Sequence, residues 1–272
     1  MTPRTAVRSE HWLELKNIEV WQNDRVLVKG LSLDLMLGEP TTVLGPNGSG
    51  KSTLVKLIER RLHPVVKPNS HLRLFGTDRI HLQNLRQRIG ILNTELDERI
   101  PRRCSVGEVV LSGCFGSTRL GRGQEPTDQQ YKQTKELLER FELQSLEHRQ
   151  YYQLSDGQKR RLLLARALIH QPEVLVLDEP ARALDLRACH QLMAMIRELC
   201  QDGATVVQVT HRVDTIVPEM QKTVLLKDGR VYDQGSPHDL LTSANLSKLF
   251  GTDLTIVEAN GFRQVVPGAS EH

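Results

Sequence analysis

Residues 41–52 read TTVLGPNGSGKS, and this stretch decides the fold of the chain. Thr41 to Leu44 form a compact β-prone run, glycine-rich residues follow it, and a helical pattern extends from Ser52 to about Arg61. The middle of the stretch, Gly45 to Ser52, matches the pattern Gly-x-x-x-x-Gly-Lys-Ser/Thr. Because this pattern lies between a strand and a helix, it predicts a phosphate-binding loop rather than an ordinary glycine turn.

Each residue type in this loop has a chemical reason. Glycines let the backbone curl so that successive N–H groups point at phosphate oxygens, and the following helix directs its positive end to the same place. Lys51 supplies a mobile charge for the β- and γ-phosphates, and the hydroxyl of Ser52 is a ligand for Mg²⁺. The predicted phosphate-binding set is Gly45, Pro46, Asn47, Gly48, Ser49, Gly50, Lys51, Ser52 and Thr53.

A pair of carboxylates ends a second apolar run, VLVLDE at residues 174–179. Asp178 is expected to hold Mg²⁺ through bound waters, and Glu179 is placed to orient or deprotonate an attacking water as a general base. An Asp-Glu pair at the end of a strand is, taken alone, more often a solvated turn. The phosphate-binding loop elsewhere in the chain favours the catalytic interpretation.

The first half of the chain predicts an antiparallel opening followed by a helical insertion. Trp12 to Leu37 reads as short alternating strands joined at polar turns that contain Asn23-Asp24 and Lys29-Gly30. Residues 94–160 are polar and charged with helical periodicity, most clearly from Thr127 to Phe141. We therefore expect an antiparallel β unit before the insertion and helices within it.

The second half predicts a parallel sheet. Strand runs over Glu173–Leu177 and Ala204–Thr210 flank a helical segment, Leu186–Cys200. The order strand, helix, strand implies parallel pairing. A hairpin with an Asp228-Gly229 turn closes the body, and a short tail leads to His272.

The composition narrows the function classes. The chain has 272 residues, and 36 Lys and Arg against 33 Asp and Glu give a net charge of +3 from two nearly balanced populations, so no nucleic-acid partner is expected. The longest apolar runs are far shorter than the ~20 residues that cross a bilayer. The N-terminus lacks the apolar core of a secretory signal, which makes the cytosol the default compartment. The four cysteines are too widely spaced for a zinc or redox pair, so we expect reduced thiols and no structural metal.

The segment LSDGQ at residues 154–158, about twenty residues before the metal-binding strand, resembles the signature motif of the ATP-binding cassette (ABC) ATPases. In that family the signature opens a helix and presents its amides and serine to the γ-phosphate of ATP bound on a second subunit. The resemblance implies that Ser155, Gly157 and Gln158 act in trans. The residues agree, because a polar cap before a helical pattern makes an anion-attracting helix start.

The resemblance also implies roles for several single residues. Trp21 lies where the family has an aromatic ring that stacks on adenine, although an aromatic residue in such a strand is often part of the core. Asp185 matches the loop that crosses the dimer interface, and His211 resembles the switch histidine that contacts the γ-phosphate. The resemblance thus implies a catalytic set of Glu179, His211 and Lys51.

The chain departs from the family at three places. Simple register puts Thr94 where the family has a glutamine that binds Mg²⁺, and nearby Asp97 is an alternative ligand. Asp156 replaces the usual glycine of the signature, and Arg182 replaces a common serine of the interface loop, so that the two charges can offset each other across a dimer. The segment ILNTELDER is faintly similar to the molybdenum-transport and photorepair-like branch of the family.

These observations predict an α/β fold of the P-loop NTPase (ABC ATPase) type, with a mainly parallel core sheet, an antiparallel β subdomain and a helical insertion. We expect one domain over residues 1–272. Its nucleotide-binding core covers about 12–93 and 161–250, its helical subdomain about 94–160, and its short C-terminal tail 251–272.

The resemblance implies an ATPase that uses ATP and Mg²⁺, works as a head-to-tail homodimer and energises an ABC transporter. The favoured role is an importer subunit for a metal, a metal chelate or an oxyanion. Such a subunit is cytoplasmic and peripheral on the inner face of the membrane, with an integral membrane permease and an extracytoplasmic binding protein as partners. The alternative is a soluble ABC ATPase acting in DNA repair or translation without a permease. An adaptor that binds ATP without hydrolysing it is disfavoured by Lys51, Asp178, Glu179 and His211 together.

Overall fold

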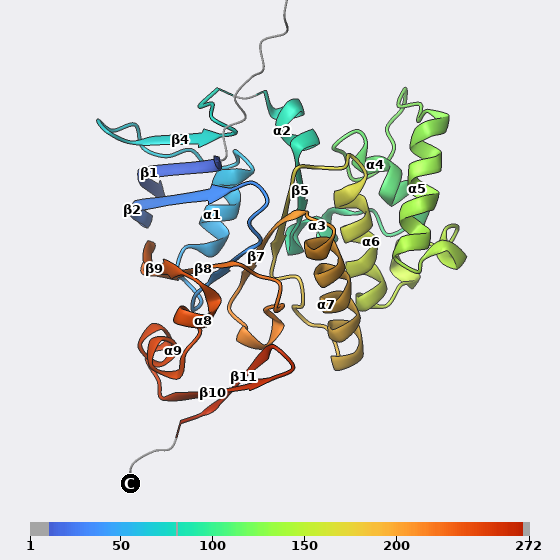
Figure 1. The fold of residues 1–272 in the computed structure, drawn as a ribbon. Coiled ribbons are helices and arrows are strands. Elements are labelled where there is room, and N and C mark those ends of the chain that lie inside the picture. Colours follow the sequence, from blue (N-terminus) through green and yellow to red (C-terminus); the bar gives the residue numbers. More distant parts are fainter. Residues whose placement is uncertain (1–10, 80, 269–272) are drawn as a thin grey trace, which may run out of the picture.

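The core of the computed structural model is a six-stranded sheet with the strand order β5-β6-β7-β3-β8-β9 (Figure 1). The structure describes residues 11–79 and 81–268. The pairs β5–β6, β6–β7, β7–β3 and β3–β8 are parallel, and β8–β9 is an antiparallel hairpin. The strands are β3 (Thr41–Leu44), β5 (Ile89–Leu92), β6 (Val174–Asp178), β7 (Thr205–Thr210), β8 (Lys222–Lys227) and β9 (Arg230–Gly235). The predicted α/β fold with a mainly parallel sheet is confirmed.

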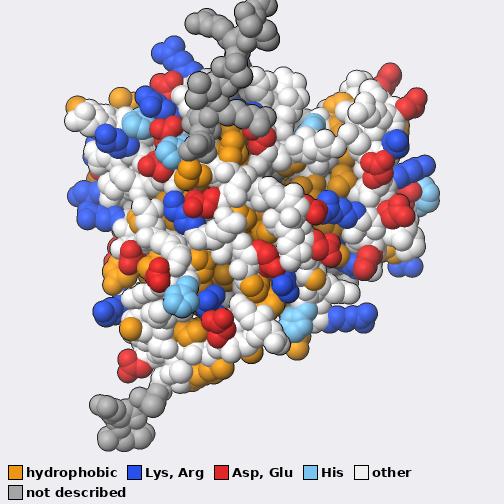
Figure 2. Space-filling model, viewed as in Figure 1, with side chains coloured by type: hydrophobic (Ala, Val, Ile, Leu, Met, Phe, Trp, Pro, Cys, Tyr) orange, Lys and Arg blue, Asp and Glu red, His pale blue; other side chains and the backbone are white. Residues whose placement is uncertain are grey.

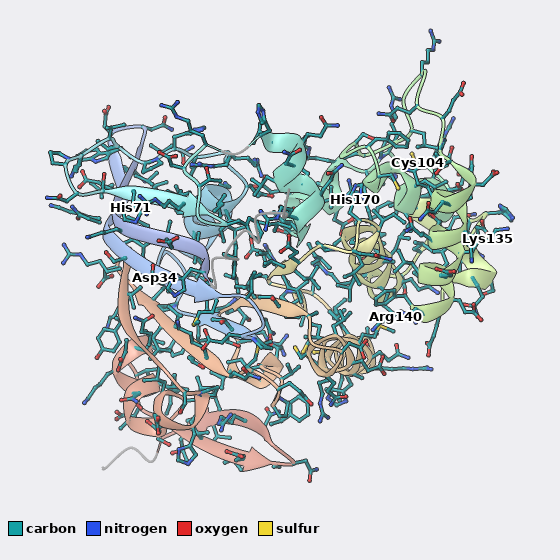
Figure 3. All side chains as sticks on the ribbon, turned by 45° about the horizontal axis from the view of Figure 1, so that its top comes forward. Asp34, His71, Cys104, Lys135, Arg140 and His170 are labelled. Carbon is teal, nitrogen blue, oxygen red and sulfur yellow. The ribbon has the colours of Figure 1, made fainter. Side chains whose placement is uncertain are left out.

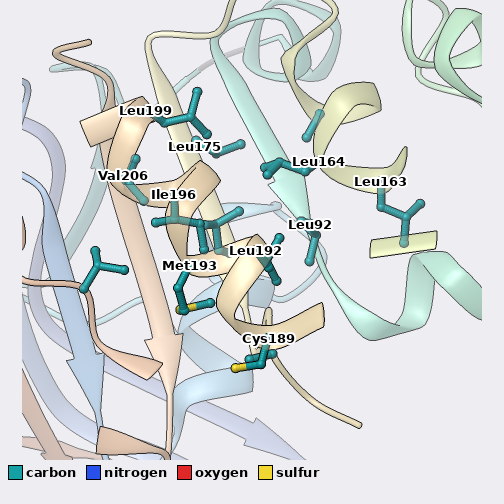
Figure 4. Close-up of a cluster of buried hydrophobic side chains, with 14 of the residues drawn as sticks. Leu92, Leu163, Leu164, Leu175, Cys189, Leu192, Met193, Ile196, Leu199 and Val206 are labelled. Carbon is teal, nitrogen blue, oxygen red and sulfur yellow. The ribbon is translucent and has the colours of Figure 1, made fainter. Parts of the chain in front are cut away.

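The inner strands β6, β7, β3 and β8 are buried on both faces, which explains their continuous apolar runs, whereas the edge strand β9 is largely exposed. Along β6, Val174 and Val176 pack on the side of β1, β2 and α1 (Lys51–Ile58), whereas Leu175 and Leu177 pack on the opposite side. Figure 4 shows that opposite layer, where side chains of α7 (Leu186–Gln201) meet those of the sheet and of α6 (Asp156–Leu168). The sheet is therefore the middle of three layers.

An antiparallel unit of three strands, in the order β2-β1-β4, covers α1. Its strands are β1 (His11–Gln22), β2 (Arg25–Met36) and β4 (His71–Leu74). Asn23 and Asp24 form the turn between β1 and β2, both with positive φ, as expected. The turn predicted at Lys29-Gly30 is wrong, because β2 continues through it. Gly30, with φ of 72°, is instead the extra residue of a β-bulge opposite the Ile18–Glu19 step.

Residues 94–160, where the periodicity predicts helices, contain several helices separated by loops, and the last of them continues to Leu168. They are α3 (Thr94–Arg99), α4 (Val106–Gly113), α5 (Asp128–Arg140), two single turns, η1 (Gln144–Leu146) and η2 (Tyr151–Gln153), and then α6. Reciprocal capping boxes begin three of the α-helices, at Ser105, Thr127 and Ser155. Helix α4 packs between α5 and α6, and α6 rests on β5. A further helix, α2 (Leu82–Arg88), precedes β5. In the described residues, no helix is both long enough and apolar enough to span a bilayer.

The segment after residue 251 contains an ordered hairpin where we expected only a short tail. It follows α8 (Pro237–Leu240) and α9 (Ser243–Phe250), and its strands are β10 (Leu254–Ala259) and β11 (Phe262–Pro267). Asn260 and Gly261 form its turn, both with positive φ, which is the signal that the sequence analysis overlooked. Strand β11 packs against the short helix η3 (Val213–Thr215), and Phe262 joins the core beside the guanidinium of Arg197.

The surface carries both signs of charge, and Figure 2 shows basic and acidic side chains interspersed over the visible face. This arrangement agrees with the nearly balanced charge of the sequence. Arg140 at the end of α5 pairs with Asp202 after α7, which ties the helical insertion to the core (Figure 3).

Gly90 in β5 offers a test of this packing. A methyl group there would lie 2.3 Å from the backbone oxygen of Ala167 in α6 and 3.0 Å from Pro172. We expect Gly90→Ala to lower the free energy of unfolding by about 1–3 kcal/mol, the usual range for overpacking. Urea unfolding followed by circular dichroism measures this change. Gly121→Ala is the control, because its methyl would meet only Gln124 at 3.5 Å. Equal midpoints for the two variants would contradict the close approach of α6 to β5.

Candidate functional site

The loop between β3 and α1 has a shape that only glycine permits at three positions. Gly48 and Gly50 have φ values of 80° and 102°, and Gly50 is the N-cap of α1. A methyl group on Gly45 would lie 2.3 Å from the backbone oxygen of Leu226. The N–H of Gly229, in the β8–β9 turn, donates to the oxygen of Ser49 at 3.1 Å. The loop is thus held between β8 and its hairpin turn, with the N-terminus of α1 at its centre.

Lys51 is buried and folds back over the loop. Its Nζ donates to the backbone oxygens of Gly45 at 2.7 Å and Pro46 at 3.0 Å. Burial lowers the pKa of Lys51, while the carboxylates of Glu179 and Asp178 oppose that shift. The amine therefore stands between the loop and the two acidic residues at the end of β6.

Asp178 ends β6 with one buried carboxylate oxygen, Oδ1, that receives no hydrogen bond from the residues that the structure describes. Burial, with the neighbouring charge of Glu179, raises the pKa of Asp178 to about 6, and Lys51 opposes this. A buried carboxylate oxygen without a partner fits a divalent cation or its bound water. The exposed Ser52 begins the same helix as Lys51.

Glu179 is held by three contacts. Its N–H donates to the oxygen of Val209 at 2.8 Å, Nδ1 of His211 lies 2.7 Å from its Oε1, and the Thr210 hydroxyl donates to Oε2 at 3.4 Å. Glu179 also has a φ of 48°, a strained value for a non-glycine residue that tends to persist at functional sites. The contact from Thr210 was missed in the sequence, where nothing distinguishes this residue from the other threonines of the strands.

Part of the loop, Lys51 and Glu179 line one cavity of about 630 Å³, whereas Asp178 does not belong to its described lining. Its lining is Val26, Leu27, Asn47, Gly48, Gly50, Lys51, Ser52, Thr53, Glu179, Arg182 and His211. The structure therefore brings the predicted phosphate loop together with Glu179 and His211. It adds Arg182, which the sequence analysis noted only as a departure from the family.

Trp21 lies at the end of β1 and outside that lining set, although its cross-strand neighbour Val26 belongs to it. The indole is 50% exposed, so Trp21 is not a core residue. Its Nε1 donates to Oε1 of Glu19 at 2.6 Å, which leaves the faces of the ring free of this bond.

The predicted signature residues do not join the cavity of their own chain. Ser155 and Gln158 form the capping box of α6, with the Ser155 N–H bonded to Oε1 of Gln158 at 2.9 Å. A methyl on Gly157 would lie 2.7 Å from the side chain of Ala188, near the start of α7. Asp185 caps α7 by accepting the N–H of Ala188 at 2.7 Å. The predicted signature and the predicted interface loop thus pack against each other where Gly157 approaches Ala188.

Neither Thr94 nor Asp97 belongs to the described lining of the cavity. Thr94 begins α3, and Oδ1 of Asp97 accepts the hydroxyl of Tyr151 at 2.7 Å. Asn93 is the residue that continues β5 next to Asp178, because Leu92 pairs with Leu177. The side chain of Asn93 caps α3 and donates to Oε1 of Glu59 at 2.8 Å. Its place before a helical pattern is typical of an N-cap, a signal that the sequence analysis did not use.

Comparison with known proteins supports these observations. The family model described as "ABC transporter" matches residues 28–182, more than half of the chain. An ABC transporter ATP-binding protein of Methanopyrus kandleri is 35% identical over 226 residues, covering 82% of this chain and 81% of that protein. The hemin import ATP-binding protein of Aliivibrio fischeri is 31% identical, with 91% and 93% covered. The Nod factor export ATP-binding protein I of Burkholderia orbicola is 32% identical, with 89% and 77% covered.

Solved structures show the same fold. One cassette of a transporter described as the metal-chelate type aligns with a TM-score of 0.76 and 27% identity, covering 96% of this chain and 98% of that one. CbiO1 of Clostridium perfringens, part of a transporter complex, gives 0.73 and 28%, covering 88% and 94%. A dimeric cassette bound to ADP and phosphate gives 0.68 and 26%, covering 82% and 98%. The chain belongs to the ABC transporter family, in which it is the subunit that binds and hydrolyses ATP.

Proposed function

We propose that this chain energises an importer of a metal, a metal chelate or an oxyanion by hydrolysing ATP in the 630 Å³ cavity. The main support for catalysis is the position of the Glu179 carboxylate, which contacts His211 and Thr210 and lines the same cavity as the predicted phosphate-binding loop. The relatives named for hemin import and metal-chelate transport support the importer, whereas the Nod factor relative is named for export.

In this proposal the loop amides and Lys51 bind the β- and γ-phosphates of ATP. Ser52 and Asp178 would hold Mg²⁺, which neutralises charge on the phosphate oxygens when it is bound. Glu179 accepts a proton from the attacking water as the oxygen of that water bonds to the γ-phosphorus and ADP leaves with the bridging oxygen. His211 keeps the carboxylate in place through Nδ1.

A second copy of the chain completes the site. Ser155, Gly157 and Gln158 lie at the start of α6 and outside the described lining of their own cavity, and we assign them to the cavity of a facing subunit. The amides at the start of α6 then add positive potential at the γ-phosphate. The dimeric cassette among the similar structures supports this arrangement.

A membrane partner fits a second cavity, of about 230 Å³, between the proposed nucleotide-binding core (12–93 and 161–250) and the proposed helical subdomain (94–160). Its lining includes Glu59, Asn93 and Leu96 beside the end of β5, and His170 at the end of α6, which Figure 3 labels. The charged lining is mainly basic: Arg61, Arg86, Arg99 and Arg166 against Glu59. A permease segment with acidic and apolar residues suits this groove. Docking there makes the chain peripheral on the inner face of the membrane.

The catalytic proposal predicts that Glu179→Gln still binds ATP but hydrolyses it at least ~10²-fold more slowly, because a general base is lost. Phosphate release and nucleotide titration measure the two properties separately. Glu139→Gln, on the exposed side of α5, is the control. Unchanged turnover in Glu179→Gln would remove this residue from its proposed role.

Adenine is proposed to stack on Trp21, beside Val26 of the cavity wall. We expect Trp21→Ala to weaken ATP binding by about 1–3 kcal/mol, the range for a base stacked on an aromatic ring. Calorimetric titration gives the affinity, and Tyr131→Ala removes a similarly exposed ring from α5 as the control. If both variants bind ATP as tightly as the parent, adenine lies elsewhere.

The importer proposal predicts that the tagged chain is recovered from cells with an integral membrane protein. The double variant Arg86→Glu, Arg99→Glu should lower that recovery about tenfold while ATP affinity stays constant, because it reverses the charge of the groove alone. Lys135→Glu with Arg122→Glu, both exposed on the helical insertion, is the matched control.

Cells whose only copy of the protein is the Glu179→Gln variant should accumulate less of one metal, as measured by elemental analysis. Recovery with ribosomes or DNA alone would favour the soluble ATPase instead.

A further inference from the structure

Arg182 is a charged residue of the nucleotide cavity to which the proposed mechanism gives no role. It follows β6 in a tight turn and lines the cavity together with Lys51, Glu179 and His211. Its N–H donates to the backbone oxygen of Glu179 at 3.1 Å, so the turn fixes Arg182 relative to the proposed general base. The backbone of Arg182 is thus fixed to that of Glu179, the proposed general base.

The turn is held on its other side as well. Nη2 of Arg160, a buried residue of α6, lies 3.5 Å from the backbone oxygen of Arg182. Glu179 and Ala183 flank the turn with φ values of 48° and 62°, both strained for residues with a side chain. Backbone strain of this kind persists only where the surrounding structure fixes the conformation.

The guanidinium of Arg182 is exposed, and across residues 11–79 and 81–268 no carboxylate forms an ion pair with it. The other charged groups of the cavity are engaged, because Lys51 bonds to two carbonyl oxygens and Glu179 bonds to His211. Burial lowers the pKa of nearby Arg160, and the charge of Arg182 adds to that shift, so the neighbouring cation repels Arg182 rather than neutralising it. The guanidinium of Arg182 is therefore able to bind an anion in the proposed nucleotide cavity.

We propose that Arg182 binds the γ-phosphate of ATP in its own subunit, as a second phosphate-binding cation beside Lys51. A guanidinium presents parallel N–H groups that match two phosphate oxygens, which an amine does not. During hydrolysis charge spreads over the equatorial oxygens of the γ-phosphoryl group, and a positioned arginine stabilises it. This inference rests on the proposed nucleotide site.

The competing arrangement pairs Arg182 with Asp156 of a second copy across the dimer. In its own chain Asp156 already lies 3.4 Å from the amine of Lys159. The two arrangements differ in what they require: a γ-phosphate contact needs ATP, whereas an ion pair between subunits needs only the second copy.

The test measures turnover and affinity for the parent, Arg182→Ala and Arg182→Lys. We expect Arg182→Ala to lower kcat by about 10²-fold or more, in line with arginines that stabilise phosphoryl transfer, and Arg182→Lys to lie between the two. Affinity for a non-hydrolysable ATP analogue should fall about tenfold in Arg182→Ala, while affinity for ADP stays within about twofold, because only the γ-phosphate contact is lost. Added methylguanidine should restore part of the turnover of Arg182→Ala, which a merely misfolded variant would not show. Arg187→Ala, exposed on α7, is the control.

Two results would overturn the inference. One is an equal loss of ADP and analogue affinity without rescue, which assigns Arg182 a structural role. The other is a double-mutant cycle in which Asp156→Asn has no further effect once Arg182 is removed, which shows the pair across the dimer. Lys51→Ala separates this inference from the site itself: if that variant binds ATP as tightly as the parent, the nucleotide site is wrong whatever Arg182 does.

Discussion

Burial of the parallel strands on both faces is the constraint on which the rest of the structure depends. Strands β3, β6 and β7 have no face open to water along their length, so charged groups are accommodated only where the strands end. Parallel strands end at the same edge, and for that reason Gly45, Asp178 and His211 meet although they are far apart in the sequence. The chemistry of the site follows from the topology of the sheet.

At this edge of the sheet, burial of charged side chains shifts their pKa values. Burial lowers the pKa of Lys51 and raises the pKa of Asp178, and each of these two groups opposes the shift of the other. Such a cluster is costly to bury unless opposite charges and backbone oxygens compensate it. Here the amine of Lys51 bonds to the loop, while Oδ1 of Asp178 has no bond from the described residues. This arrangement supports the proposed binding of ATP together with Mg²⁺ at this edge.

Features set by local chemistry could be predicted from the sequence. The phosphate loop needs glycine at fixed positions, and the caps of α5 and α6 need Thr127 and Ser155, so each leaves a pattern within a few residues. Features set by distant neighbours could not. Gly30 permits a turn or a bulge equally well, and only its pairing with β1 decides for the bulge. Thr210 donates a hydrogen bond to Glu179, 31 residues away, and Asn93 donates one to Glu59, 34 residues away. No pattern within a few residues predicts contacts over such separations. The β10–β11 hairpin had a local signal, Asn260-Gly261, that was overlooked.

The packing of β11 on η3 also orders events during synthesis. Helix η3 begins two residues after His211 and bonds to β7 through Gln208, whose side chain donates to the oxygen of Thr215 at 2.8 Å. The residues of the hairpin leave the ribosome after those of β7, so the segment beyond His211 gains its outer support late. The phosphate loop forms late as well, because β3 pairs with β7 and β8 and the N–H of Gly229 bonds to the oxygen of Ser49. Both halves of the site are therefore completed only after the last third of the chain has been made.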